Sequence, residues 1–448
     1  MARKWEDYRD ASGSPGDAFQ SLFRRTERTA RCRREHAFQP KSKANRMIKT
    51  IRPFERPITV VRPTLPPLEE FREGLEGIWK RKWLTNDGPL VNQFRDQLTQ
   101  FCRTDHVSLF TNGTLALQIA LQGLGISGDV ITTPYTFVAT THSLFWNKLR
   151  PVFVDIDPTY FCLDPDRIEA AITPWTSAIL AVHVYGHPCD LEALQTIANR
   201  HGLKLLYDAA HAFGVEVAGK PIGSFGDISM FSFHATKVFH SIEGGMLTFR
   251  DGGLQRHLDY LKNFGFENET EVVMPGTNAK MSEFHALMGI LLLKRVEEMI
   301  DKRRILAWHY RTRLAQIPGI CLTAPPRPVV RYNYAYMPIT VDHDCFGMTR
   351  DELYENLRRY NVIVRRYFYP IIPDFSCYRG KFGNTDLSIS RSLASRVITL
   401  PLHGDLTIDE VDRICDMIEY FHEQARPAAA VSVSRDHSMT YLLDAVGR

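Results

Sequence analysis

Lys237 closes the segment Phe231-Ser232-Phe233-His234-Ala235-Thr236-Lys237, whose first residues are those of a buried strand. A lysine at such a place is normally solvated. One that forms a Schiff base must instead be reachable by a carbonyl and lose its proton readily, which burial and nearby positive charge promote. Ser232 lies five residues upstream, so its hydroxyl could hold a phosphate on the molecule whose aldehyde Lys237 captures.

Asp208 follows a second expected strand, residues 204–207, and would lie at the end of a sheet in a partly dry setting. A carboxylate there needs a cationic partner. A protonated pyridine nitrogen would provide one, and this pairing makes a pyridoxal ring a strong electron sink. The alternative is that Asp208 caps a helix that begins at Ala209.

The segment Phe110-Thr111-Asn112-Gly113-Thr114 joins a third strand to the start of a helix. Small residues at this point let the backbone approach an anion, and the free N–H groups of a helix start favour phosphate. The alternative for Asn-Gly-Thr is a simple turn with a helix cap.

An alternation of apolar strands and amphipathic helices must position these residues. Ligands of open α/β sheets bind beyond the carboxyl ends of the strands, which is where all three segments fall. The pattern predicts an α/β domain with a mainly parallel sheet. Its expected strands are residues 107–110, 130–133, 151–155, 178–184, 204–207, 228–233 and 246–249, and its clearest helices are 114–124 and 190–200.

The organisation along the chain predicts two folded domains. A large domain spans residues 57–316 and ends in one long connecting helix from about 282 to 316, and a small α/β domain follows at 317–425. Within the small domain we expect strands at 334–341 and 362–364 and helices at 349–360 and 407–424. Residues 1–56 read as a basic extension and 426–448 as a tail.

The composition of the 448 residues, 44% hydrophobic and 24% charged, is ordinary for a soluble globular protein. Residues 1–57 hold 15 lysines and arginines against 7 acidic residues, so this arm could touch an acidic surface, but a solvated extension is the simpler interpretation. The eight cysteines are scattered without metal-ligand spacing, which predicts neither a metal site nor disulfides. Without a membrane span or secretory signal, we expect a cytoplasmic protein.

Taken together, five motifs resemble the DegT/DnrJ/EryC1/StrS family of sugar aminotransferases, over residues from about 57 to 422. Each motif is weak singly, but the set is specific. They stand here as Asn112-Gly113-Thr114-Leu115-Ala116-Leu117, Thr133-Pro134-Tyr135-Thr136-Phe137-Val138-Ala139, Val182-His183-Val184-Tyr185-Gly186, Asp208-Ala209-Ala210-His211-Ala212, and Ser232-Phe233-His234-Ala235-Thr236-Lys237 with Glu243-Gly244-Gly245.

The resemblance implies a fold type I, aspartate aminotransferase-like enzyme that uses pyridoxal 5'-phosphate (PLP). It implies that Lys237 holds the cofactor and shuttles the proton, and that Asp208 pairs with the pyridine nitrogen. The remaining implied cofactor contacts are Gly113, Thr114 and Ser232 at the phosphate, Phe137 stacked on the ring and His211 beside it.

Asn263, in Lys262-Asn263-Phe264-Gly265, resembles the asparagine that reaches the phosphate of the neighbouring subunit in this family. The resemblance therefore implies a homodimer with shared active sites. The family usually has a histidine after this asparagine, where this chain has Phe264, and the alternative is an asparagine that merely ends a helix.

The substrate is suggested by two further segments, residues 83–89 and 365–370, which look like those of enzymes that aminate C4 of dTDP-4-keto-6-deoxyglucose. Thr85 in the first segment and Arg365 and Arg366 in the second are the candidate substrate contacts. The guanidinium groups of the two arginines could donate paired hydrogen bonds to a pyrophosphate. Paired arginines can also be one surface charge and one structural partner. The implied ping-pong cycle takes the amino group from L-glutamate and leaves 2-oxoglutarate and dTDP-4-amino-4,6-dideoxyglucose.

Two alternatives stay open at this point. Amination of a 3-keto sugar, or a galacto epimer as the product, fits the same motifs. The other alternative is a PLP-binding regulator whose basic arm contacts nucleic acid, but no helix-turn-helix pattern lies beside the arm. We therefore expect a transaminase of amino-sugar biosynthesis without a nucleic-acid partner.

Overall fold

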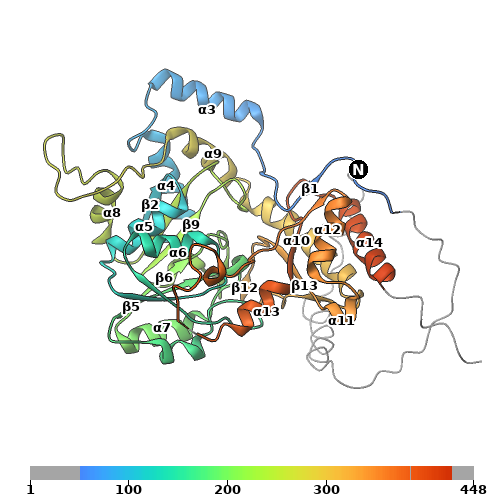
Figure 1. Ribbon diagram of the computed structural model, residues 1–448. Coiled ribbons are helices and arrows are strands. Elements are labelled where there is room, and N and C mark those ends of the chain that lie inside the picture. The colour runs from blue at the N-terminus through green and yellow to red at the C-terminus, as the bar shows by residue number, and fades with distance from the viewer. Residues whose placement is uncertain (1–50, 384, 426–448) are drawn as a thin grey trace, which may run out of the picture. The chain divides into compact units, whose positions relative to one another are not determined.

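The computed structural model describes residues 51–383 and 385–425, and the expected tail and residues 1–50 of the basic extension lie outside this part. Its main feature is a seven-stranded sheet (Figure 1). Across the sheet the order is β2 (His106–Phe110), β10 (Gly245–Phe249), β9 (Ile228–Ser232), β6 (Lys204–Asp208), β5 (Thr176–Val182), β3 (Asp129–Thr132) and β4 (Arg150–Phe153). Only β10 runs antiparallel to its neighbours within this sheet, which confirms the mixed, mainly parallel α/β fold.

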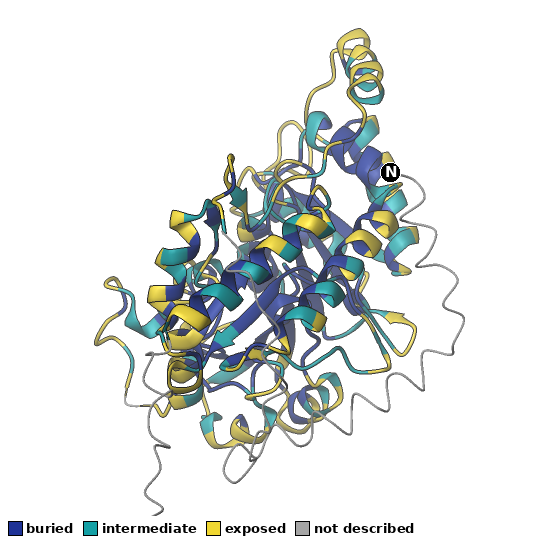
Figure 2. Cartoon of the chain, turned by 90° about the vertical axis from the view of Figure 1, so that its right-hand side faces the viewer, coloured by how far each residue is buried: buried dark blue, intermediate teal, exposed yellow. Residues whose placement is uncertain are grey.

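The strands are buried on both faces, as near-continuous apolar runs require. Alternate side chains of β6 show this: Leu205 and Tyr207 pack into one hydrophobic core, and Leu206 packs into the other. Figure 2 shows the strands as the buried interior, with exposed residues on the outer faces of the helices. The strand ends are thereby fixed, and so are the loops that carry the functional side chains.

Helices cover both faces of this sheet. Those that supply side chains to one core are α5 (Gly113–Gly123), α6 (Val138–Trp146) and α8 (Leu254–Lys262). The other core receives α4 (Pro89–Cys102), α7 (Leu191–His201), α9 (Glu283–Leu293) and the start of α10 (Val296–Leu314). Helix α3 (Leu68–Arg81) packs on α9 at the rim.

The connecting helix expected over residues 282–316 is wrong as a single element, because the structure has α9 and α10 instead. Arg295 separates them with a non-helical backbone (φ −118°, ψ 0°). Its guanidinium compensates by donating to the Leu291 carbonyl at 2.8 Å, which satisfies an acceptor at the end of α9. Helix α10 still connects two parts of the protein. Val296 packs in one of the two cores of the large sheet, and Tyr310 packs in a further hydrophobic core outside this sheet, named the second core.

The second core surrounds an antiparallel sheet of β11 (Ile320–Leu322), β13 (Met337–Val341) and β15 (Val397–Leu400). The other elements around this core are α11 (His343–Phe346), α12 (Arg350–Arg359), α14 (Ile408–Ala425) and the parallel pair β1 (Ile58–Thr59) and β14 (Val362–Ile363). Helix α13 (Ser388–Arg396) leads into β15 but packs Leu393 and Ala394 into a core of the large sheet. Three short strands, β7 (Glu216–Val217), β8 (Lys220–Pro221) and β12 (Val330–Arg331), form a separate small sheet.

Phe54 is buried in the second core, and its N–H donates to the Tyr360 carbonyl at 3.1 Å. Residues 51–56, which the sequence analysis assigns to the basic extension, therefore pack on the folded part of the chain.

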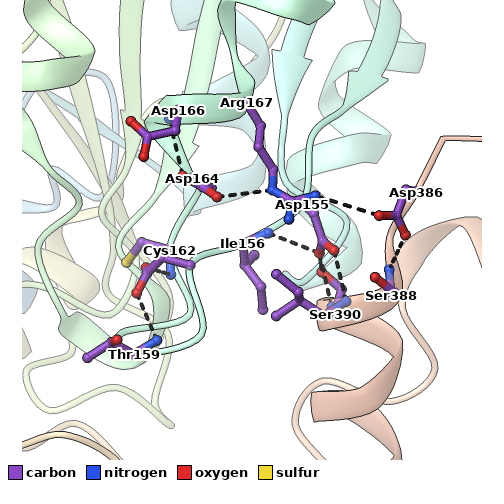
Figure 3. Close-up of polar contacts among 12 residues, drawn as sticks. Asp155, Ile156, Thr159, Cys162, Asp164, Asp166, Arg167, Asp386, Ser388 and Ser390 are labelled. Carbon is purple, nitrogen blue, oxygen red and sulfur yellow. Dashed lines mark hydrogen bonds and ion pairs between the residues drawn. The ribbon is translucent and has the colours of Figure 1, made fainter.

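A buried carboxylate ties the two sheet regions together (Figure 3). Asp155, just beyond β4, accepts backbone N–H bonds from Ile389 at 2.9 Å and Ser390 at 3.0 Å, and it also accepts the Ser390 hydroxyl. These groups begin α13, whose N-cap residue Leu387 has no side chain able to accept them. Asp155 thus replaces the missing helix cap from a strand end more than 230 residues earlier in the chain.

Candidate active site

Asp208 is the last residue of β6 and is buried at the carboxyl edge of the sheet. Its Oδ2 accepts the Thr140 hydroxyl at 2.7 Å, and its Oδ1 accepts the Ala210 N–H at 3.1 Å. Burial raises the pKa of Asp208, while these hydrogen bonds and the field of Lys237 lower it. A protonated nitrogen facing this carboxylate would favour its ionised form further.

Lys237 lies in the loop after β9 and is half-buried. Its backbone N–H donates a hydrogen bond to the His234 carbonyl at 2.9 Å. Burial lowers the pKa of the Lys237 ammonium, and the fields of Asp208 and Tyr367 raise it. Because the influence of burial is the larger, the neutral amine is easier to reach than in an exposed lysine. This is what a Schiff-base lysine needs.

His211 lies in the loop that follows Asp208 at the end of β6 and is buried beside Lys237. Its ring is parallel to Phe368 at 6.0 Å and meets Tyr336 edge-on at 4.9 Å. Burial, followed by the field of Lys237, lowers the His211 pKa well below its ordinary value, so the ring is neutral. Its Nδ1 has no hydrogen-bond partner within the described part of the chain, which leaves one buried polar atom for a ligand.

Ser232 and Gly113 form a narrow cradle where β9 ends and α5 begins. A Cβ atom on Gly113 would lie 3.0 Å from the Ser232 Cβ, so glycine lets the helix start approach the strand end this closely. Asn112 caps α5 by accepting the Leu115 N–H at 2.8 Å. Thr114 is exposed on the first turn. The hydroxyls and the N-terminal end of α5 fit the phosphate of a cofactor.

Phe137 is the N-cap residue of α6, and its side chain is 55% exposed. The same helix turn carries Thr140 toward Asp208. An exposed aromatic ring on this turn is placed to cover a flat ligand that contacts Asp208.

Asn263 ends α8 and accepts the Lys280 ammonium at 2.7 Å within its own chain. Lys280 also lies over the exposed Phe264 ring, 5.0 Å from its centroid. The structure therefore gives Asn263 a local partner, and no described contact joins it to Lys237 of the same chain. Its role toward a neighbouring subunit stays a prediction.

The three candidate substrate residues differ in their surroundings. Thr85 lies in an exposed loop, where its carbonyl accepts the Trp83 indole N–H at 2.6 Å. Arg366 donates to Asp351 at 2.7 Å and lies 4.1 Å from the Tyr354 ring centroid, so it has structural partners. Arg365 pairs only through its backbone with Thr399, and its exposed side chain makes no ion pair with a described residue.

Sequence reasoning missed three contributors to the site. Tyr336 and Asn333 line the same pocket as Lys237 and come from the segment before β13, where no motif marks them. Thr140 belongs to a threonine pair with i, i+4 spacing, Thr136 and Thr140, which is the one signal that could have indicated it.

Within the described residues no group of histidines, cysteines or carboxylates could hold a metal ion. Nor does any described helix have the length and apolarity to cross a membrane.

A Schiff-base lysine opposed by a carboxylate for the pyridine nitrogen is the way proteins hold PLP for amino-group chemistry. Lys237 and Asp208 influence each other's pKa at one edge of the sheet, and Ser232 lies close to the start of α5 at the same edge. On this α/β fold, the site defines the class of PLP-dependent transaminases.

The comparisons agree with this class and narrow it. Residues 68–419 match the model of the DegT/DnrJ/EryC1/StrS aminotransferase family, and the chain belongs to that family. A dTDP-4-amino-4,6-dideoxy-D-glucose transaminase of Shigella dysenteriae is 46% identical over 82% of this chain and 99% of its own length. A transaminase of the same name from Escherichia coli is 44% identical over 81% and 98%.

Among solved structures, DesI determined in the presence of its TDP-sugar product superimposes with a TM-score of 0.80. It is 38% identical, and the match covers 84% of this chain and 95% of DesI. The expected family and fold are therefore confirmed, and the chain is a PLP-dependent sugar aminotransferase.

Proposed function

We propose that this enzyme moves the amino group of L-glutamate to C4 of dTDP-4-keto-6-deoxyglucose, giving dTDP-4-amino-4,6-dideoxyglucose and 2-oxoglutarate. The choice of sugar is supported by the names of the Shigella and Escherichia relatives, because this chain matches each relative over nearly the relative's whole length. The observation that carries the chemistry is the opposition of Lys237 and Asp208 at the carboxyl edge of the large sheet.

PLP would supply an aldehyde and an electron sink. Lys237 would hold that aldehyde through its ε-amine and would carry the proton to and from the substrate carbon. Asp208 would pair with the ring nitrogen of the bound cofactor and keep it protonated. The depressed pKa of Lys237 helps its amine to act as the proton acceptor near neutral pH.

The remaining residues orient the cofactor. Ser232 and the first turn of α5, with Gly113 and Thr114, hold the phosphate by hydroxyl and backbone N–H donors. Phe137, which is exposed, would cover one face of the ring, and the neutral His211 would offer its unpartnered Nδ1 to a ring substituent. The orientation is set by rigid strand ends and by helix starts.

For the nucleotide sugar, Arg365 is the better of the two arginines for the pyrophosphate, because Arg366 is engaged by Asp351 and Tyr354. Thr85 lies in an exposed loop, where a substrate could reach it. We further propose a homodimer in which Asn263 serves the active site of the neighbouring subunit.

The test begins with the absorbance spectrum of the purified protein before and after L-glutamate is added. A change to the amino form of the cofactor identifies the donor. The loaded enzyme is then given the 4-keto and the 3-keto dTDP-sugar, and NMR locates the new nitrogen. Nitrogen at C4 of the gluco product supports the proposal, and nitrogen at C3 overturns the choice of sugar while leaving the transaminase class intact.

A further inference from the structure

Thr140 is fully buried in the first turn of α6, and its hydroxyl is in contact with Asp208. The carboxylate of Asp208 is held from two sides, by this hydroxyl on Oδ2 and by the Ala210 N–H on Oδ1. Only the Thr140 bond comes from a different element of the fold, because Ala210 follows Asp208 in the chain. Thr140 therefore fixes the direction in which the carboxylate points relative to α6.

A second threonine extends this hydrogen bond. The hydroxyl of buried Thr136 lies 2.8 Å from that of Thr140. An ionised carboxylate only accepts hydrogen bonds, and a threonine hydroxyl has a single proton to donate. The Thr140 proton is therefore committed to Asp208, and Thr136 must donate to Thr140. The result is an ordered chain from Thr136 through Thr140 to the carboxylate.

The electrostatics of the site show what these hydrogen bonds do for Asp208. Burial favours the neutral form of Asp208, and the hydrogen bond from Thr140 is the largest of the influences that oppose it. The positive end of the α6 dipole is also on the side of Thr140, in the first helical turn. The same turn carries Phe137, so one short segment contacts Asp208 and presents the aromatic ring.

We propose that Thr136 and Thr140 form a hydrogen-bond relay that keeps Asp208 ionised and aimed at the ring nitrogen of the cofactor, which makes Thr140 a positioning residue for amino-group transfer. This inference rests on the role proposed above for Asp208.

The neighbouring Thr141 offers a matched control. It is equally buried on the same helix, but its hydroxyl has no hydrogen-bond partner among the residues described. Thr140→Val and Thr141→Val make the same chemical change one position apart, and only the first removes a contact with Asp208. A purely structural need for threonine in α6 would affect both.

The experiment measures the PLP dissociation constant by absorbance titration, and kcat and KM for the nucleotide sugar, in the full-length enzyme. Thr140→Val should bind PLP about tenfold more weakly, as expected for a lost hydrogen bond to a charged group. Its kcat should fall while KM for the sugar stays unchanged. Thr140→Ser keeps the hydroxyl and should restore both values, and Thr141→Val should match the wild type.

Asp208→Asn, measured in parallel, separates the two proposals. If Asp208→Asn is impaired but Thr140→Val behaves like Thr141→Val, the relay is wrong and the role of Asp208 stands. If Asp208→Asn is also normal, the role proposed for Asp208 fails first. If Thr140→Val does not fold, Thr136→Val is measured in its place. The bond it removes is one step further from Asp208, so the relay predicts that PLP binds about threefold more weakly. Unchanged PLP binding would overturn the relay.

Discussion

The chemistry proposed for this enzyme rests on two side chains whose charges are disfavoured by burial, Lys237 and Asp208. Both residues could be predicted from the sequence by their types and by their positions after strands. A Schiff base requires a lysine, and a protonated pyridine nitrogen requires a carboxylate partner, so few residue types are suitable. The contacts that shift the pKa values of these two residues could not be predicted from the sequence. Thr140 reaches Asp208 from 68 positions away, and only the packing of α6 against the sheet brings them together.

Asp208→Asn tests the carboxylate directly. A neutral amide cannot keep the ring nitrogen protonated, so we expect kcat to fall at least about a hundredfold, or roughly 3 kcal/mol of transition-state stabilisation. Some cofactor should remain bound, because the phosphate cradle and Lys237 are intact. Steady-state kinetics and the absorbance of the dialysed variant check both points, and normal turnover would contradict the assigned role.

At the scale of elements, the seven strands of the large sheet were predicted to within two residues at each end, since buried parallel strands are short apolar runs. Helix α7 was also predicted, with Asp190 as its cap, accepting the Ala193 N–H at 3.1 Å, and Gly202 at its end with φ 64°. The break between α9 and α10 was missed because Lys294-Arg295 contains neither proline nor glycine. Helix α13 was not predicted, because Leu387 at its N-cap gives no helix-start signal and its cap is supplied by the distant Asp155.

This distant cap predicts a stability effect at a position outside the active site. In Asp155→Asn, the new amide turns two donors toward a cluster of backbone N–H groups, so the free energy of unfolding should fall by about 1–3 kcal/mol. Urea denaturation measures the change. Asp386 accepts the Ser388 N–H near the start of the same helix, but its side chain is 70% exposed (Figure 3). Asp386→Asn is therefore the control and should cost about 0.5 kcal/mol or less; equal losses would refute the capping role.

At the scale of the whole molecule, buried histidines make stability depend on pH. Burial lowers the pKa of His183 to about 3, and burial with the fields of Arg311 and Arg327 lowers that of His187 to about 3. The unfolded chain, with a histidine pKa of about 6.5, binds more protons than the native state between these values. Their stabilising contribution is therefore complete above pH 6.5 and is lost as the pH falls toward 3.

Each of these histidines should cost the native state about 1 kcal/mol when the pH is lowered from 6.5 to 5.5. Urea denaturation at several pH values measures the slope. A variant carrying His183→Gln and His187→Gln removes both proton-binding sites and should show a shallower slope over the same range. An unchanged slope would mean that other groups set the acid sensitivity.

The two-domain organisation predicted from the sequence remains a proposal. The structure supports it because the hydrophobic core around β11, β13 and β15 is distinct from the two cores of the large sheet, and α10 connects it to one of them. The boundary at residue 56 could not be judged from sequence, because Phe54 stands among basic and proline residues that give no periodic pattern. Phe54 is buried because it packs in one hydrophobic core with residues of α12 and α14, which lie far from it in the sequence.

The central claim is that the amine of Lys237 condenses with the aldehyde of PLP. Borohydride reduction of the purified enzyme, followed by proteolysis and mass spectrometry, traps that bond. We predict that the pyridoxyl label falls on the peptide containing Lys237, and that Lys237→Ala remains folded by circular dichroism but carries no label and has no turnover. A reduced wild-type enzyme with Lys237 unlabelled, or labelled at another lysine, would contradict the account.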